Sequence, residues 1–254
     1  MNRVDYIRRY VTDQFWNGMA RKPEDRTPLS RDEANSLLIS CLVNRGIQWE
    51  RAMGSANTLG LVDEMKIRTG YSDTIRLFTE LNDVMTEWHM FADYAAVDGE
   101  GKQLPSLHRY RYMASYCCLA AARVRDQYDS DIRNIWRDEP TGQEFLRRIF
   151  EFKGLKQKCG GLFARVAVLS HGAVLWDNYA GLDISPDVHV VRVMKRLGLV
   201  SENATTQEVI NRARELSPYA PVEWEGLWLH GVEVCSAVPR CGECSISRGC
   251  SSRR

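Results

Sequence analysis

The chain has 254 residues, of which 44% are hydrophobic and 26% charged, and its formal net charge is +1. This composition is ordinary for a globular protein and excludes a chain that is disordered throughout. The length allows a sizeable core, so no disulfide framework is needed for stability. The first residues mix charges into an apolar pattern, and no later apolar run is long enough to span a bilayer. We therefore expect a cytoplasmic protein with no membrane partner.

Capping signals and apolar periodicity mark the helical segments expected along the chain. Ser30, Thr141 and Thr205 each stand three residues before a glutamate and just ahead of an apolar run, the pattern of a helix N-terminus. Helical periodicity also fits 3–18, 81–95, 108–127, 158–169, 187–197 and 221–231. Strand-like alternation is scarce, and only 173–184 is ambiguous enough to run extended. We therefore predict an all-α fold of about ten helices.

Basic residues are concentrated in two stretches of the chain. Residues 147–170 contain six Lys or Arg and one acid, and residues 235–254 contain four Arg and one acid. Because the net charge is near zero, this clustering indicates a basic face that suits a partner with phosphates. Ordinary solvated helix faces are the alternative explanation.

Four of the eight cysteines lie close together near the C-terminus, in the pattern C-x5-C-x2-C-x5-C. They are Cys235, Cys241, Cys244 and Cys250. In a reducing compartment, clustered thiols more often bind metal than form disulfides, and four of them can hold either Zn²⁺ or an iron–sulfur cluster. Structural zinc sites usually pair two short knuckles, whereas only the middle pair is tightly spaced here, so the spacing favours iron–sulfur over zinc. The other cysteines, 41, 117, 118 and 159, lie in apolar helical contexts and are expected to be core residues.

The segment "WLHGVEVCSAVPRCGECSISRGC" resembles the C-terminal cluster loop of the endonuclease III family of DNA glycosylases. In that family a helix ending in Leu-His-Gly precedes four cysteines that bind a [4Fe-4S] cluster. The first arm is one residue shorter here than in the family. The resemblance implies that the four clustered cysteines are the ligands of a [4Fe-4S] cluster.

Two upstream segments carry the same resemblance. "FKGLKQKCGGLFARVAV", residues 152–168, is similar to the helix-hairpin-helix of the family, and Lys158 falls on the family's catalytic lysine. "SPDVHVVRV" is similar to the segment that carries the catalytic aspartate, which falls on Asp187. Taken alone, Asp187 stands where a helix cap is expected, after Pro186 and at the start of a helical run, and such a cap would fix the carboxylate facing the lysine. The matching His189 is expected to be structural.

The hairpin departs from the family at two positions. Lys153 replaces the usual proline and Lys156 the usual second glycine. A lysine there can exchange a backbone contact with a DNA phosphate for a side-chain contact. Lys153, Gly154 and Lys156 are therefore candidate DNA contacts.

Two further loops are candidates for DNA binding. "RDEANSLLISCLVNRGIQWERAM" resembles an early helix, loop and helix whose loop inserts into the duplex, but Asn44-Arg45-Gly46 replaces the usual Ser-Ala-Gln. Arg45, Ile47 and Gln48 are candidates for the missing wedge, and an ordinary interhelical turn is the alternative; Arg45 and Gln48 are predicted DNA contacts. Arg240 and Arg248 of the cysteine loop are expected to grip the DNA backbone.

The resemblance implies a two-lobed helix-hairpin-helix DNA glycosylase fold, with a six-helix barrel lobe and an iron–sulfur cluster lobe. The barrel is expected over 31–184, with the hairpin at about 145–170. The cluster lobe is expected to combine 1–30 with 185–254 and to carry the iron–sulfur loop at 235–250. The cleft between the lobes would then place Lys158 opposite Asp187.

The expected activity is that of a bifunctional DNA glycosylase and AP lyase, monomeric and associated with the nucleoid. It would extrude a modified base, by default an oxidised pyrimidine, from duplex DNA. Lys158 would attack the sugar to form a Schiff base, aided by a helix dipole and neighbouring lysines that disfavour its charged form, and Asp187 would stabilise the developing charge. A non-catalytic iron–sulfur protein that recognises distorted or modified DNA is the first alternative, and a zinc-stapled helical adaptor the second.

Overall fold

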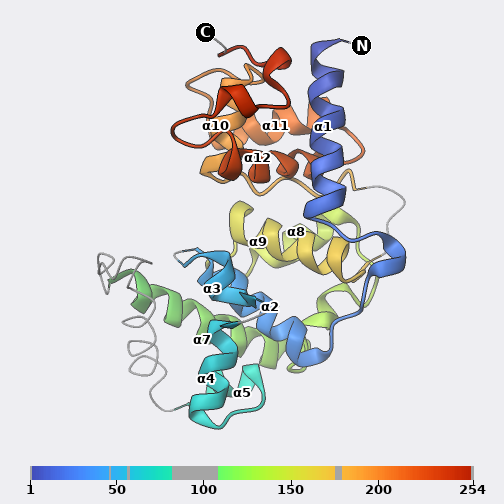
Figure 1. Cartoon of the computed structure of the whole chain (residues 1–254). Helices are drawn as coiled ribbons and strands as arrows, with labels where there is room; N and C mark the ends of the chain where they lie inside the picture. The colour runs from blue at the N-terminus through green and yellow to red at the C-terminus, as the bar shows by residue number, and fades with distance from the viewer. Residues whose placement is uncertain (1, 46, 56–57, 82–107, 175–178, 253–254) are drawn as a thin grey trace. The chain divides into compact units, whose positions relative to one another are not determined.

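The computed structural model describes residues 2–45, 47–55, 58–81, 108–174 and 179–252 of the chain, without the side chains of 108–112. The contacts divide the chain into two compact units. Unit 1 comprises residues 1–27, 141–146 and 164–254, and unit 2 comprises 28–140 and 147–163. Each unit is described separately below, and Figure 1 shows the helices of both.

Unit 1 joins the N-terminal helix to the C-terminal third of the chain. Its elements are α1 (Arg3–Gly18), a 3-10 turn η1 (Pro23–Asp25), a π-helical turn η3 (Val166–Ser170), α10 (Val188–Arg196), α11 (Thr206–Leu216), a 3-10 turn η4 (Pro221–Gly226), α12 (Leu227–Glu233), and two short turns, η5 (Cys241–Glu243) and η6 (Ser247–Gly249). Helix α1 packs on η4 and α12 through Ile7, Val11 and Phe15, which are fully buried. Trp224, also fully buried, belongs to the same core, so the first and last parts of the chain build one hydrophobic core.

Unit 2 is the larger helical bundle of the middle of the chain. Its elements are α2 (Arg31–Val43), α3 (Trp49–Met53), strands β1 (Gly54–Ser55) and β2 (Thr58–Leu59), α4 (Leu61–Thr69), α5 (Thr74–Glu80), α7 (His108–Tyr128) and a 3-10 turn η2 (Ile132–Trp136). The two strands form a short antiparallel ladder. Helix α2 is buried along most of its length and packs on α7, α5 and α4, and therefore forms the centre of the unit.

Two helices run across the division between the units. Helix α8 (Gly142–Phe150) begins in unit 1 and ends in unit 2, and α9 (Gln157–Arg165) begins in unit 2 and ends in unit 1. Together with the turn at 151–156 they form the predicted hairpin. Among the helices that the structure describes, none combines the length and hydrophobicity needed to traverse a bilayer.

The predicted helix starts are confirmed where the structure describes them. The Ser30 and Thr205 capping boxes are both complete, and the Thr141 hydroxyl accepts the backbone N–H of Glu144 at 3.3 Å. The helix expected over 81–95 falls almost entirely outside the described residues. The helix expected over 221–231 starts with a 3-10 turn after Pro221, and that over 158–169 ends in the π-helical turn.

The contact-based division differs from the predicted lobe boundary at residue 184. Residues 164–174 and 179–184 belong to the same compact unit as α1 and the C-terminal helices. Arg165 donates to the carbonyl of Met19 at 2.9 Å, and His171 Nδ1 lies 2.9 Å from the carbonyl of Thr27. Such partners, distant in sequence, could not be read from local periodicity.

Candidate functional site

The hairpin turn is shaped by two buried side chains and one glycine. Phe152 and Leu155 are almost completely buried, and backbone hydrogen bonds run from Phe152 to Ile149 at 3.1 Å and from Leu155 to Phe152 at 3.1 Å. Gly154 has φ of +96°, and a Cβ there would lie 2.7 Å from Cδ2 of Tyr116. Because side chains rarely adopt this φ and the space is filled, position 154 requires glycine.

Close packing of α8 on α9 is set by a second glycine. A Cβ at Gly160 would lie 2.8 Å from the ring of Phe150 and 3.0 Å from the side chain of Ile149. The N–H of Gly160 donates to the carbonyl of Lys156 at 2.7 Å, which fixes the start of α9. Lys158 therefore projects from the first turn of a helix whose position within unit 2 is closely determined, and its side chain is exposed.

Two predicted DNA contacts meet at one aromatic ring. Lys153 Nζ lies 5.7 Å from the centroid of the Tyr116 ring, and the guanidinium carbon of Arg45 lies 5.8 Å from it. Both distances fall within the range of cation–π attraction. Lys156 instead donates to the carbonyl of Phe150 at 3.2 Å and so helps to cap the end of α8.

Two positive charges near the start of α9 act on the pKa of the buried thiol of Cys159. Burial raises the pKa of Cys159, and the positive charges of Lys158 and Arg45 act to lower it. Arg45 therefore lies within electrostatic reach of the segment that carries Lys158, although more than 100 residues separate them along the chain. Arg45, Lys153 and Lys158 form one basic surface of unit 2, which we call the Tyr116 surface.

The three candidates for insertion into the duplex, Arg45, Ile47 and Gln48, lie in the loop between α2 and α3 and differ in exposure. Asn44 Nδ2 donates to the carbonyl of Ile47 at 3.0 Å, and the Ile47 side chain is only 8% exposed. Ile47 packs inward and is not available to enter a duplex, so that candidate is wrong. Arg45 and Gln48 are both exposed.

Asp187 caps the N-terminus of α10. Its Oδ1 accepts the backbone N–H groups of His189 at 2.8 Å and Val190 at 3.0 Å. A carboxylate at this position satisfies otherwise unpaired donors and interacts favourably with the helix dipole. The same bonds restrict the orientation of the carboxylate. The expectation that Asp187 caps a helix is confirmed.

His189 and Arg192 of α10 contact the segment around Gly231 and Cys235, where the cysteine loop begins. Arg192 contacts His189 Nδ1 at 3.0 Å, donates to the carbonyl of Gly231 at 2.8 Å, and donates to that of Cys235 at 3.0 Å. The side chain of His189 packs so closely on Gly231 that a Cβ there would lie 2.9 Å from it. These contacts support the structural role expected for His189.

Backbone carbonyls of the cysteine loop are held by arginines from two helices. Arg196 of α10 donates to the carbonyls of Ser236 at 2.5 Å and Ala237 at 3.0 Å. Arg3 of α1 donates to the carbonyl of Gly249 at 2.7 Å. The beginning and the end of the loop are therefore fixed from outside by charge-assisted hydrogen bonds.

The four thiols of the loop are all free and lie in one neighbourhood. Cys241 is exposed, and the other three are partly buried against the core of unit 1. Burial raises the pKa of Cys244, and charges on Cys235, Cys250 and Cys241 act to raise it further. In the described part of the chain, no group of three or more His, Cys, Asp or Glu side chains is arranged so that it could hold a metal ion. Four thiols within sixteen residues are nevertheless the donor chemistry of zinc or an iron–sulfur cluster, and the one carboxylate between them, that of Glu243, is paired with Arg240.

The two arginines predicted in the cysteine loop differ in their surroundings. Arg240 donates to the carbonyl of Glu233 and pairs with Glu243 at 2.9 Å. Arg248 is exposed on the short turn that precedes Cys250. Arg240 therefore helps to order the loop, while Arg248 faces solvent.

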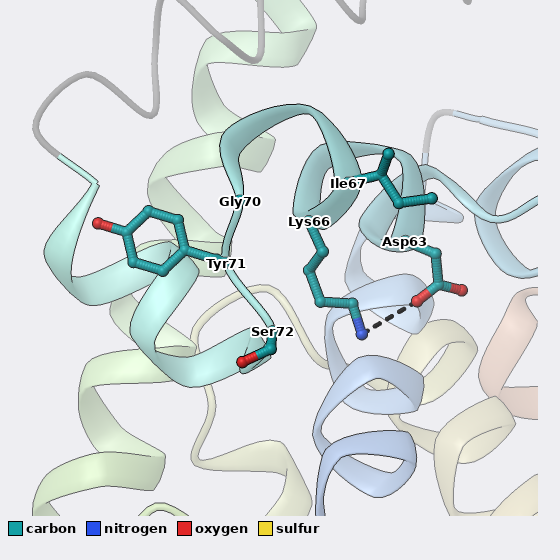
Figure 2. Close-up of a pocket in the computed structure, with 6 residues that line it drawn as sticks. All are labelled: Asp63, Lys66, Ile67, Gly70, Tyr71 and Ser72. Atoms are coloured by element: carbon teal, nitrogen blue, oxygen red, sulfur yellow. Dashed lines mark ion pairs between the residues drawn. The ribbon is translucent and has the colours of Figure 1, made fainter.

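A shallow cavity of about 450 Å³ lies at the turn between α4 and α5 of unit 2. Figure 2 shows Lys66 reaching toward Asp63, 3.0 Å away, with Gly70, Tyr71 and Ser72 on the turn opposite. None of the residues predicted to be catalytic, metal-binding or DNA-binding lines it. The candidate chemistry is therefore not in this cavity.

Comparison with known proteins places these features in a known architecture. No protein-family model and no curated protein sequence matches the chain. A solved structure of a non-covalent endonuclease III–DNA complex superposes with a TM-score of 0.61 at 17% identity, over 99% of this chain and 96% of that one. The chain has the fold of endonuclease III.

Two other solved structures share this endonuclease III-like fold. A thermostable thymine-DNA glycosylase gives a TM-score of 0.61 at 16% identity, over 98% of this chain and 96% of that one. A trapped endonuclease III–DNA covalent intermediate, in an estranged-adenine complex, gives 0.57 at 15% identity, over 99% and 97%. The predicted all-α, helix-hairpin-helix glycosylase fold is confirmed.

Some residues that shape the site were missed from the sequence. Tyr116 lies in the middle of α7 and has no local pattern that marks it as the partner of Arg45 and Lys153. Arg192 and Arg196 do carry a signal, because residues four apart share one helix face. That spacing puts the two arginines on one face of α10, but nothing local connects this face with Cys235, which lies 39 residues after Arg196.

Proposed function

We propose that this protein is a DNA glycosylase with associated AP lyase activity, which removes a modified base from duplex DNA through a covalent intermediate on Lys158. The observation that carries the proposal is the exposed Lys158 in the first turn after the hairpin of an endonuclease III-like fold. Asp187, fixed as the cap of α10, supplies the carboxylate that such chemistry requires. Lys158, Asp187 and the four cysteines occur along the sequence in the order that the resemblance predicts.

Double-stranded DNA is the proposed partner, bound by the protein as a monomer in the cytoplasm, at the nucleoid. Two of the matching structures are complexes of endonuclease III with DNA. The Tyr116 surface supplies three exposed or partly exposed cations next to the hairpin, and Gln48 and Arg248 supply further exposed polar groups. Cations at fixed positions attract phosphates and set the register of the duplex. A base must then leave the stack to be reached.

The proposed reaction has two steps that use the same lysine. The neutral Nζ of Lys158 attacks C1′ of the sugar, the C1′–N bond breaks, and the base departs with the bonding electrons and takes up a proton. Asp187 accepts the proton that Nζ loses and stabilises positive charge on the sugar. The nitrogen lone pair then breaks the C1′–O4′ bond, and O4′ takes up the proton held by Asp187, which leaves an open-chain iminium. The iminium acidifies the proton at C2′, and removal of that proton by a base breaks the C3′–O3′ bond, expels the 3′ phosphate and cleaves the strand. Water then releases the lysine.

An oxidised pyrimidine is the proposed substrate. The resemblance supplies this default, and one matching structure is that of a thymine-DNA glycosylase, an enzyme for a pyrimidine base. Duplexes that each carry one modified base, incubated with the protein under single-turnover conditions, identify the lesion that is excised.

We also propose that Cys235, Cys241, Cys244 and Cys250 hold a [4Fe-4S] cluster, with zinc as the alternative. The cluster would supply a rigid centre for the basic loop and no bond chemistry at the sugar. Its expected role is to fix the loop that carries Arg248, together with the bonds from Arg196 and Arg3. Visible charge-transfer absorbance with about four moles of iron per mole of protein, against about one mole of zinc and no visible absorbance, separates the two metals.

Borohydride trapping on DNA tests the proposal directly. The wild-type protein and the Lys156→Gln variant should form a covalent adduct with an abasic duplex and cleave it, whereas Lys158→Gln should do neither. Lys156 is a suitable control because it is also exposed but donates only to the end of α8. Adducts that persist in Lys158→Gln would overturn the assignment of the nucleophile. Tight binding to damaged duplexes without cleavage by wild type would favour a non-catalytic DNA-binding protein.

A further inference from the structure

A buried ion pair lies close to the segment that carries Asp187. Arg165, at the end of α9, places Nε 2.5 Å from Oε2 of Glu225 in η4. The two residues are 8% and 4% exposed. Burying two charges is unfavourable unless they are paired and their remaining hydrogen-bonding groups are satisfied. Such a pair is therefore expected to have a specific task.

The remaining bonds of this pair connect three segments of unit 1. Arg165 donates to the carbonyl of Met19 at the end of α1, at 2.9 Å. Glu225 Oε1 accepts the backbone N–H of Ser185. The ion pair thus ties the end of α1 and the η4 turn to the peptide two residues before Asp187.

The link from Ser185 to Asp187 is short and stiff. Pro186, which is buried, lies between them and has a fixed φ. Asp187 then caps α10 through the N–H groups of His189 and Val190. A displacement of the Ser185 peptide would therefore be passed directly to the carboxylate of Asp187.

The electrostatics of Glu225 follow from the same geometry. Burial raises the pKa of Glu225, the charge of Arg165 and the bond from the Ser185 N–H act to lower it, and the charge of Asp187 acts to raise it. An apolar side chain at position 225 could fill the space but could not accept the Ser185 N–H. This explains why a hydrogen-bond acceptor, rather than a hydrophobic group, occupies the site.

We propose that Glu225, held by Arg165, is a positioning residue that fixes the orientation of the Asp187 carboxylate for base excision. Glu225 acts through the Ser185 peptide and does not contact the sugar or the base. The inference rests on the proposed glycosylase function, in which Asp187 is the catalytic carboxylate.

A second ion pair on the same segment provides a matched control. Asp183 is almost completely buried and pairs with Arg214 of α11 at 2.6 and 2.7 Å. It stands two residues before Ser185, as Asp187 stands two residues after it, but among the described residues its carboxylate bonds to Arg214 of α11 alone. Its loss should lower stability without turning Asp187.

The experiment replaces each pair by neutral residues of similar size. In Arg165→Met/Glu225→Leu no charge is left unpaired, but the Ser185 N–H loses its acceptor; Arg165→Met/Glu225→Gln restores an acceptor. We expect single-turnover excision to fall about 10- to 100-fold in the first variant, the range for a small misplacement of a reacting group. Affinity for a duplex with an uncleavable abasic analogue should stay unchanged. The glutamine variant and the control Asp183→Asn/Arg214→Gln should keep near wild-type excision.

A double-mutant cycle separates positioning from general destabilisation. In an Asp187→Asn background the Arg165→Met/Glu225→Leu change should cause no further loss of rate, because there is no carboxylate left to orient. A full additional loss in that background would overturn the proposal.

Amide hydrogen exchange tests the positioning without any reaction. The N–H groups of His189 and Val190 should exchange about tenfold faster in Arg165→Met/Glu225→Leu and at the wild-type rate in the Asp183 control, because only the first loosens the Asp187 cap. If wild type excises no base, the proposed function fails while this measurement still decides the positioning role. Unchanged exchange would refute that role. Should the leucine variant not fold, Glu225→Asp, whose shorter carboxylate keeps its charge but cannot reach Ser185, is expected to show the same faster exchange.

Discussion

The hairpin and the cysteine loop are both short segments with a proposed role at DNA, but they are stabilised in different ways. The hairpin at 151–156 has its own buried side chains and a glycine that fits only one conformation. Within the fully described loop at 235–250, only Ile246 and Gly249 are buried, and arginines hold the backbone from outside. The hairpin therefore holds its shape by packing, whereas the shape of the loop depends on external hydrogen bonds and on what its thiols bind.

The largest expected effect is on the rate of strand cleavage and not on the stability of the protein. Lys158→Gln should lower the rate of strand cleavage by about 10³-fold or more, because the covalent route is lost. Since Lys158 is exposed, the thermal midpoint should stay within error of wild type. Single-turnover kinetics together with thermal unfolding check both parts. A large drop in the midpoint would show that the lysine also has a structural role.

The second-largest expected effect is on the stability of unit 1, which carries the cysteine loop. Cys244→Ala is expected to lower the free energy of unfolding of unit 1 by about 3 kcal/mol or more, because metal binding and folding of the loop are coupled. Unit 2 should unfold at its usual midpoint, giving a separated transition in denaturant. Coincident transitions at the wild-type midpoint would mean that the loop does not need its thiols.

One glycine in the hairpin and one in the cysteine loop test directly whether packing shapes the first segment but not the second. Gly154→Ala should destabilise unit 2 by about 2–3 kcal/mol, because of the positive φ and the contact with Tyr116. Gly242→Ala, in the cysteine loop, has no atom within 4 Å of the added Cβ and should change stability by less than about 0.5 kcal/mol. Denaturant titrations of both variants measure the difference. Similar losses would contradict the view that only the hairpin is shaped by packing.

The smallest effect is a pH dependence that belongs to unit 2 alone. Asp32 Oδ2 accepts from Lys66 at 2.7 Å and Oδ1 accepts the N–H of Thr74 at 2.7 Å. Burial acts to raise the pKa of Asp32, but these bonds outweigh it and hold the pKa below its usual value. Asp32→Asn should therefore destabilise unit 2 by about 1 kcal/mol near neutral pH, for a partly exposed pair.

The sign of the pH dependence follows from the lowered pKa. The stabilisation is complete above the unfolded-state pKa, about 3.9, and is lost as the pH falls through the lower folded-state value. The wild type and Asp32→Asn should therefore converge in stability once the pH lies below the lowered folded-state pKa of Asp32. Urea unfolding at several pH values measures this, and a difference that persists in acid would show that a hydrogen bond rather than the charge matters.

Local signals in the sequence predicted much of the fold. The capping boxes at Ser30 and Thr205 and the cap at Asp187 involve residues two or three apart, and the structure contains all three. Apolar neighbours predict that cysteines 41, 117, 118 and 159 lie in the core; Cys41, Cys117 and Cys159 are buried, whereas Cys118 is only partly buried. Interactions between neighbours are encoded in short patterns, which one sequence is enough to reveal.

Contacts between distant residues could not be predicted in this way. The partners Arg165 and Glu225 are 60 positions apart, and nothing near either residue signals the other. The inward packing of Ile47 likewise depends on the surrounding bundle, since periodicity alone left it equivalent to Arg45 and Gln48 as a wedge. The catalytic pairing of Lys158 with Asp187 stays a prediction.

Because α1 packs on η4 and α12, the two units can fold at different times while the chain is being synthesised on the ribosome. All segments of unit 2 have been synthesised by residue 163, so this unit can fold while the rest of the chain is still being made. Helix α1 is made first, but its Tyr6 hydroxyl bonds to the carbonyl of Ser245 at 2.5 Å and its apolar face packs on η4 and α12. The apolar side chains of α1 therefore lack their partners until η4 and α12 have been synthesised, more than 200 residues later. A chaperone that covers α1 during that interval would protect this apolar face.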